Sequence, residues 1–314
     1  MRKFNPHRAA ALLLLLAGLS AAQAQLQVDL SIKRNLYLAY EPLIAQVSIT
    51  NLSGNSLNLR DTEDSKWFAF QIETLDGRPV APRDSNHSNP ALFIKPGEKL
   101  TRPMNLTPLY PISEYGGYRI RAAVTVPSLG RTFTSSPLNV EITEGRSIFK
   151  KTVGVPPSQE GGGGTREINV LTHRLPNSSQ LYIRIQDPVR GVVHCTHRLG
   201  RIVSYGSPEI LLDEMNEVHI LQNIAPKAFL YSHIGLNGEV RNRKTYLQEI
   251  NRPLLKKTPD NLITVTGGKE YDPALEAQKK QQIPSLSDRP VALPDSDSDL
   301  TPDDEKRPKN LLSR

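Results

Sequence analysis

Cysteine is almost absent from the sequence: Cys195 is the single one in 314 residues, so no internal disulfide can form. Aromatic residues are also few, at 6% of the chain, and no Lys/Arg cluster is interleaved with them, which argues against a nucleic-acid partner. No stretch beyond residue 24 is apolar enough to span a membrane as a helix. Stability must therefore come from buried apolar surface, and we expect no transmembrane segment in the folded protein.

Residues 1–24 have the three-part pattern of a secretory signal peptide. A short basic segment without acidic residues precedes the apolar run Ala9–Leu19, and Ala22 and Ala24 supply the small residues of a cleavage site after Ala24. Cleavage there removes three of the 39 basic residues and none of the 32 acidic ones, which leaves a net charge of +4 (36 − 32). We therefore expect an exported bacterial protein, periplasmic or extracellular, with little net charge.

Residues 25–145 show the period-two alternation of β-strands that have one buried face. Apolar residues occupy every second position in Leu43–Thr50 and recur in Tyr118–Val126, and Phe68, Phe70 and Ile72 share one face. Turn-forming residues separate these runs. Several short strands in about 120 residues predict a β-sandwich.

Three segments of this half resemble parts of bacterial immunoglobulin-like domains. Glu41-Pro42 leads into an alternating strand that ends at Asn51, Lys95–Glu98 resembles a tight loop before a strand, and Tyr115–Ile120 resembles the entry to the penultimate strand. The resemblance implies an immunoglobulin-like sandwich in which Tyr118 makes a corner hydrogen bond. It implies no function, because this fold supports many.

The glycine run Gly161–Gly164 allows two interpretations. It is either part of a linker at 158–165 or the tip of a hairpin whose strands are Ser147–Val155 and Arg166–His173. We favour the hairpin, because Ile148, Val153 and Val155 in the first segment have the pattern of buried residues. The boundary between two domains, 25–145 and 146–272, then falls near Gly145.

The second domain, 146–272, is again rich in predicted strands and contains a weak internal repeat. Leu181–Ile185 precedes Gly191 and Phe229–Ile234 precedes Gly238, with the two glycines 47 positions apart (238 − 191). That period resembles one β-propeller blade. Two blades cannot close a ring, so we predict a two-unit β-meander or sandwich. Residues 273–314 are rich in Pro and charge, which predicts a disordered C-terminal tail.

The fold class expected is therefore all-β: an immunoglobulin-like sandwich, a second β-meander or sandwich, and a disordered tail. Polar residues that could carry chemistry are few. His194 and His197, three apart on a strand, face opposite sides, which leaves Cys195 and His197 as two possible ligands where zinc needs three or four. Asp213-Glu214 fits a turn better than an ion site. We assign no catalytic residue, no metal ligand and no cofactor.

Three functional hypotheses follow. The leading one is a non-catalytic exported module that binds a partner protein or a cell-envelope polymer through loops or sheet edges. The second is an exported hydrolase with a propeller-like second domain, and it predicts that Asp213, His219 and His233 converge in one cleft. The third is a protease inhibitor that presents the polar loop Asp84–Asn89, provided that residues 83–90 are held in place.

Overall fold

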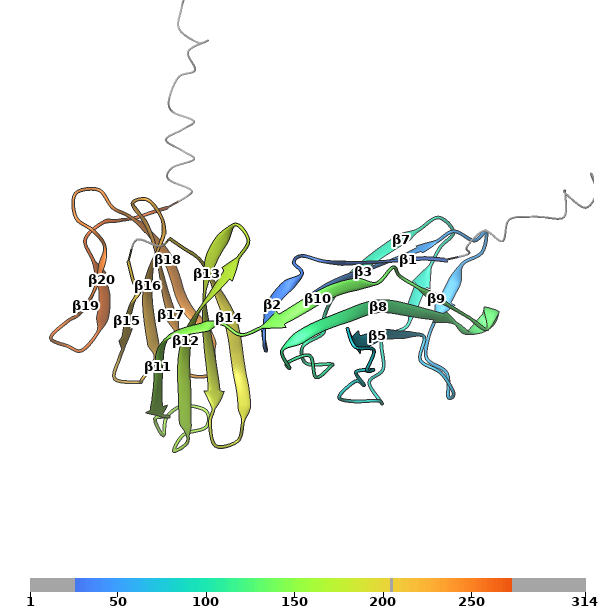
Figure 1. The fold of residues 1–314 in the computed structure, drawn as a ribbon, viewed down its shortest axis with the longest axis horizontal. Coiled ribbons are helices and arrows are strands. Elements are labelled where there is room, and N and C mark those ends of the chain that lie inside the picture. Colours follow the sequence, from blue (N-terminus) through green and yellow to red (C-terminus); the bar gives the residue numbers. More distant parts are fainter. Residues whose placement is uncertain (1–25, 204–205, 273–314) are drawn as a thin grey trace, which may run out of the picture. The chain divides into compact units, whose positions relative to one another are not determined.

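The computed structural model describes residues 26–203 and 206–272. The predicted signal peptide and C-terminal tail lie outside the described residues. Within them β-strands dominate, and the one helical element is the 3-10 turn η1 (Pro127–Leu129). No helix in the described part of the chain is long and apolar enough to cross a membrane. The prediction of an all-β protein is confirmed (Figure 1).

The N-terminal half, residues 26–145, is a β-sandwich. Its first sheet has the order β1-β3-β7 and its second the order β2-β10-β8-β5, with β9 paired to β8 and a separate pair β4-β6. The strands are β1 (Leu26–Ile32), β2 (Leu36–Leu38), β3 (Ile44–Asn51), β4 (Leu57–Leu59), β5 (Phe68–Thr74), β6 (Leu92–Ile94), β7 (Lys99–Asn105), β8 (Gly116–Val126), β9 (Arg131–Thr134) and β10 (Leu138–Thr143).

The predicted alternation explains how the two sheets share one core. On β3 the side chains of Ala45, Val47 and Ile49 are buried, and the residues between them face outward. They pack in one apolar cluster with Ile120 and Val124 of β8 in the other sheet. Burying an aliphatic side chain of this size contributes about 1.5–3 kcal/mol. The cluster therefore holds the sandwich together without a disulfide.

The corner that the resemblance implied is present at the start of β8. The Tyr118 hydroxyl donates a hydrogen bond of 3.0 Å to the backbone carbonyl of Glu114, four residues upstream. Its ring is buried, at 3% exposure, whereas the neighbouring Tyr115 is 59% exposed. The two tyrosines of this loop therefore differ in role, because Tyr118 fixes the turn and Tyr115 faces solvent.

The second half, residues 146–272, consists of two antiparallel meanders. One sheet has the order β11-β12-β13-β14 and the other the order β15-β16-β17-β18-β21, with a separate hairpin β19-β20. The strands are β11 (Arg146–Gly154), β12 (Thr165–Leu175), β13 (Ser178–Asp187), β14 (Val192–Ile202), β15 (Glu209–Leu212), β16 (Val218–Ala225), β17 (Ala228–Ile234), β18 (Val240–Leu247), β19 (Leu254–Lys257), β20 (Ile263–Thr266) and β21 (Lys269–Glu270).

The glycine run lies in the connection between β11 and β12, which pair along their length. Val153 and Val155 are buried as predicted, but the prediction for Ile148 is wrong: its side chain is 40% exposed and lies at a register shift between Ser147 and Phe149.

Gly191 and Gly238, the two glycines of the weak repeat, both adopt positive φ, 67° and 91°, in the turns after β13 and β17. Gly191 therefore lies in the turn between β13 and β14, and Gly238 lies at the equivalent place between β17 and β18. The repeat seen in the sequence reflects two similar runs of four consecutive strands, β11 to β14 and β15 to β18.

The two meanders pack against each other through a shared apolar core. Ile183 and Ile185 of β13 belong to the same buried cluster as Ile220 of β16 and Ile234 of β17. This arrangement confirms the predicted second β-meander or sandwich. On the opposite face of the second sheet, another cluster of Leu221, Phe229 and Tyr231 is covered by residues of β19 and β20. The sequence does not predict the strands of that hairpin, because Leu254–Lys257 has no apolar alternation.

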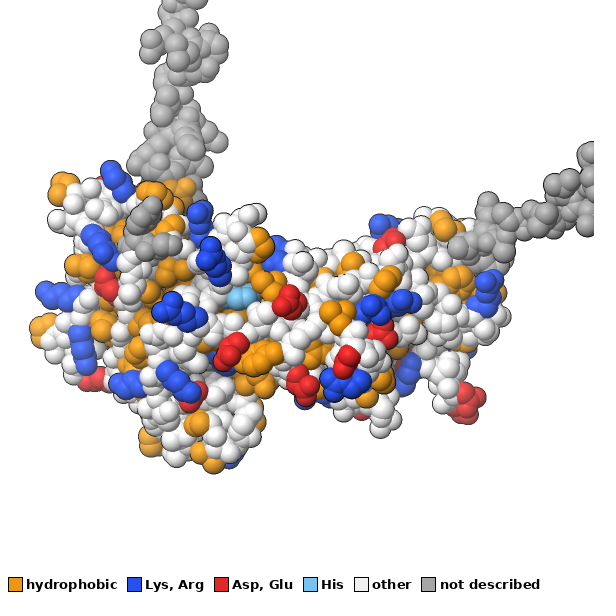
Figure 2. Space-filling model, in the orientation of Figure 1, with side chains coloured by type: hydrophobic (Ala, Val, Ile, Leu, Met, Phe, Trp, Pro, Cys, Tyr) orange, Lys and Arg blue, Asp and Glu red, His pale blue; other side chains and the backbone are white. Residues whose placement is uncertain are grey.

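A small polar and apolar cluster lies where the chain passes from one half to the other. Leu38, Leu171 and Tyr182 form a buried cluster. Beside it the Arg34 guanidinium donates to Glu41 at 2.5 Å and to the Tyr182 hydroxyl at 3.1 Å. The Glu41 carboxylate is 4% exposed, so this ion pair is largely shielded from water. On the face shown in Figure 2, other charged side chains are scattered and interspersed with hydrophobic ones.

Candidate functional site

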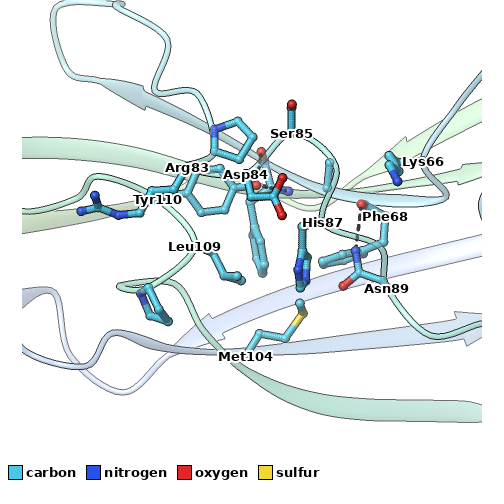
Figure 3. A pocket seen from close by; sticks show the side chains of 14 residues that line it. Lys66, Phe68, Arg83, Asp84, Ser85, His87, Asn89, Met104, Leu109 and Tyr110 are labelled. Carbon is cyan, nitrogen blue, oxygen red and sulfur yellow. Dashed lines mark hydrogen bonds between the residues drawn. The ribbon is translucent and has the colours of Figure 1, made fainter.

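An apolar cleft lies on the side of the N-terminal sandwich where the sheets end at β5 and β7. It consists of two adjoining pockets of about 120 and 170 Å³ that share Phe68, Asn89 and Met104. Sites for small molecules usually measure about 300–1,000 Å³. Each pocket therefore has room for about one side chain rather than for a cofactor. Figure 3 shows Met104, Leu109 and His87 around the first pocket.

The outer edge of β5, which forms one wall of the cleft, has its backbone groups paired by other parts of the chain. The Tyr110 hydroxyl accepts from the Phe70 N–H and donates to the Phe70 carbonyl, both at 3.2 Å. The Asn89 side-chain amide donates to the Phe68 carbonyl at 3.4 Å, and the Val80 N–H donates to the Ile72 carbonyl at 2.8 Å. This edge is therefore closed to pairing with another strand.

The polar loop of residues 83–90 is held against the cleft at several points. The Arg83 N–H donates to the Leu109 carbonyl at 2.8 Å, and the Trp67 indole N–H donates to the Asn89 carbonyl at 3.3 Å. Ser88 donates to the Asp61 carboxylate at 2.7 Å. The loop is thus presented by defined contacts, as the inhibitor hypothesis requires.

The carboxylate of Asp61 holds that loop by accepting the hydrogen bond from Ser88. Burial acts to raise its pKa, but hydrogen bonds from Ser88 and the Trp67 N–H, together with Lys66, outweigh this effect and lower the pKa below its usual range. The carboxylate therefore carries its negative charge at neutral pH.

Strand β7 forms the opposite wall of the cleft and has a free outer edge. It pairs with β3 alone among the described strands. Arg102 lies opposite the buried Val47, so a charged side chain occupies the inner face, and Pro103 lacks an N–H to donate. Inward charges and prolines are devices that discourage edge pairing. Recognition at this cleft must therefore rely on side chains.

The cysteine of β14 lies in the protein interior. Cys195 is buried in the core between the meanders, and this burial raises the pKa of its thiol to about 11. His194 is exposed, and His197 is half-buried with its Nε2 near Gly238, which also lies against the Cys195 sulfur. Cys195 and His197 thus share a side, as predicted. A thiol held in its protonated form is a poor nucleophile and a poor metal ligand.

The turn at Asp213 combines two roles in one side chain. Its Oδ1 accepts hydrogen bonds from the N–H groups of Met215 and Glu217 at 2.9 and 2.8 Å. Asn216 in the same turn has a φ of 60°, a conformation that Asn tolerates. The predicted turn chemistry is therefore present, and it leaves Oδ2 of Asp213 free to face the strands that follow.

That second oxygen faces two stacked histidines. His219 on β16 and His233 on β17 are direct cross-strand partners, and their rings stack at 4.1 Å between centroids. Asp213 Oδ2 lies 3.2 Å from His219 Nε2 and 3.9 Å from His233 Nε2, and Glu217 Oε2 lies 2.7 Å from His233 Nε2. Asp213, His219 and His233 therefore lie together, as the hydrolase hypothesis requires, but none of them lines either pocket of the apolar cleft described above. We call Asp213, Glu217, His219 and His233 the histidine–carboxylate cluster.

Neighbouring groups set the electrostatics of this cluster. Burial lowers the pKa of His219, although the hydrogen bond to Asp213 opposes that effect. Tyr231 contacts His219 Nδ1 at 2.8 Å, and burial raises the phenol pKa to about 12, so Tyr231 stays protonated. Arg241 pairs with Glu217 Oε1 at 3.1 Å. Glu217 and Tyr231 were not singled out from the sequence, although Tyr231 shares the His233 face by strand alternation.

Comparisons with known proteins add little to this geometry. No protein-family model matches the chain, and no curated protein matches it. Among solved structures, Spo0M, a sporulation control protein from Bacillus subtilis, is 10% identical, with 58% of this chain and 91% of that chain covered and a TM-score of 0.27. The periplasmic chaperone SfaE is 12% identical, with coverages of 70% and 98% and a TM-score of 0.23. TM-scores of this size do not establish a shared fold.

Proposed function

We propose that the protein is an exported, non-catalytic binding module that holds an extended segment of a partner protein in the cleft between β5 and β7. The observation that carries the proposal is the pair of adjoining apolar pockets that share Phe68, Asn89 and Met104. Alternate side chains of an extended strand lie on one face, about 6.4–6.8 Å apart. In this proposal, two apolar residues at positions i and i+2 of the segment occupy the two adjoining pockets.

The chemistry of the cleft favours a protein over an envelope polymer. Its pockets are lined mainly by aromatic and aliphatic carbon, from Phe68, Phe70 and Leu92 among others. A sugar polymer presents hydroxyl groups, which need polar partners when they are buried. Lys66 and Arg102 line the cleft as well. A segment with acidic residues beside its apolar anchors therefore suits this surface best.

The polar loop supports binding in the cleft more than inhibition at an exposed tip. Residues Asp84, His87 and Asn89 line the first pocket, so these side chains form its wall (Figure 3). An inhibitor loop would need to project its side chains into the active site of another protein. The anchored loop is better suited to form one wall of the cleft.

Export is part of the proposal and has its own test. The first described strand, β1, begins at Leu26, directly after the predicted cleavage site at Ala24, so cleavage there would leave the folded body complete. We expect the mature protein, recovered from the periplasm or medium of a bacterial host, to begin at Gln25 when its N-terminus is sequenced. Retention of residues 1–24 on a cytoplasmic protein would contradict export.

Display of random peptides against the mature protein tests the binding function. We expect enrichment of segments with two apolar residues at i and i+2 and nearby acidic residues. A Met104→Gln variant, altered in the wall shared by both pockets, should lose these peptides. Leu129→Gln, at a 38% exposed position in η1, is the matched control and should keep them. No enrichment, or equal binding by Met104→Gln, would overturn the proposal, and selective binding of isolated envelope polysaccharide would favour the polymer instead.

A further inference from the structure

The histidine–carboxylate cluster brings potential metal ligands together, and one of them has no hydrogen-bond partner. Asp213 Oδ2 lies near the Nε2 atoms of both His219 and His233, and Glu217 Oε2 contacts His233 Nε2. His233 Nε2 is buried and has no hydrogen-bond partner, although Glu217 Oε2 lies only 2.7 Å away. That contact has the distance of a hydrogen bond but not its geometry. A positive charge between these atoms would attract the carboxylate oxygens.

The spacing of these atoms suits a transition-metal ion. With metal–ligand bonds of about 2.0–2.1 Å, two ligands of a tetrahedral zinc ion lie about 3.3 Å apart. The distances from Asp213 Oδ2 to the two histidine nitrogens are 3.2 and 3.9 Å. All three ligand atoms lie within 4.8 Å of one another. The distances therefore require only small side-chain movements to close around one ion.

We propose that Asp213, His219 and His233 bind a divalent transition-metal ion of the zinc type, with Glu217 as a fourth ligand. Two imidazoles and two carboxylates are a donor set that zinc accepts, whereas calcium and magnesium take oxygen ligands alone. The stacked rings must tilt about their terminal torsions to point at one ion, and these torsions are soft. This inference stands apart from the proposed binding cleft, which lies in the other half of the chain.

The groups around the cluster fit the needs of a metal site. Tyr231 contacts His219 Nδ1, so with Nε2 on the metal, Nδ1–H can donate to the phenol oxygen and fix the ring. Arg241 binds Glu217 Oε1 and leaves Oε2 toward the cluster. The side chains of His233 and Asp213 are 22% and 19% exposed, so the cluster lies close to the protein surface, although His233 Nε2 itself is buried. His219, at 6%, forms the inner wall.

The rival explanation is that a proton on His233 bridges the two carboxylates and no metal binds. Titration of the chelator-treated mature chain with zinc chloride, followed by calorimetry and metal analysis, separates the two. We expect one zinc per chain and a raised midpoint of thermal unfolding. Cobalt(II) in place of zinc should give the intense visible absorption of a four-coordinate site. An absence of zinc binding by the wild-type chain would overturn the proposal.

Variants locate the site and guard against misfolding. His233→Asn, at the more exposed position, should weaken zinc binding by at least about tenfold, because removing a ligand costs no less than disturbing its supporting residues. Glu217→Gln tests the fourth ligand. His87→Asn, in the sandwich loop, is the matched control and should bind zinc as the wild type does. If His233→Asn stays folded by circular dichroism and binds zinc equally well, the assignment is wrong.

Discussion

The hydroxyl of Tyr110 provides a sharp test of how β5 is held at the cleft. It pairs both the N–H and the carbonyl of Phe70 on the outer edge of the strand, and the ring is 6% exposed. Tyr110→Phe removes only the hydroxyl and keeps the edge-to-face contact with Phe70. Each lost hydrogen bond costs about 1 kcal/mol net, and more where the partner stays buried. We therefore expect the free energy of unfolding to fall by about 2–3 kcal/mol.

Urea denaturation followed by tryptophan fluorescence is a suitable assay, because Trp67 is the single tryptophan and directly precedes β5. A loss of this size lowers the thermal midpoint by about 4–12 °C in a body of this length. Tyr115→Phe is the matched control, since Tyr115 is 59% exposed, and it should change stability by less than about 0.5 kcal/mol. If Tyr110→Phe is as stable as this control, the hydroxyl does not close the edge of β5 and the reasoning fails.

Three further perturbations follow from the structure. Because burial raises the Cys195 pKa to about 11, a thiol reagent at pH 8 should modify it only after unfolding, and rapid labelling of the native chain would contradict this. The lowered pKa of Asp61 means that its stabilising contribution is present above the unfolded-state pKa and is lost as the pH falls through the folded-state value. An Asp61→Asn variant should therefore show a smaller decrease in stability on acidification, measured by urea unfolding at several pH values. Glu41→Ala leaves the partly buried Arg34 without its partner and should cost about 3 kcal/mol, whereas Glu63→Ala, at an exposed position, should cost almost nothing in the same assay.

Local patterns in the sequence predicted those parts of the fold that depend on neighbouring residues. The alternation in Leu43–Thr50 places β3, and the glycine pair before Tyr118 places the corner, because both depend on a few consecutive residues. Strand alternation likewise puts Cys195 and His197 on one side. In each case the periodicity of the strand directly determines which face a side chain occupies.

The candidate sites depend on pairings between distant residues, which no local pattern encodes. The stacking of His219 on His233 depends on the register of β16 and β17, and a shift by one residue would turn one ring to the opposite face. The cleft depends on two strands, β5 and β7, that belong to different sheets. A loop that reads as polar and exposed also supplies Asn89, which closes the edge of β5.

Because the two oxygens of Asp213 have different partners, sequence differences among related chains carry different information at Asp213 and at His233. One oxygen holds the turn through the N–H groups of Met215 and Glu217, so selection for the hairpin alone would preserve an acceptor here. His233 holds no turn: its ring stacks on His219, and its Nε2 lacks a hydrogen-bond partner. In related chains, therefore, an unchanged Asp213 would be uninformative about metal binding. If His233 is retained in related chains, selection for a metal ligand is supported. If His233 is freely replaced while Asp213 is kept, selection has preserved the turn alone.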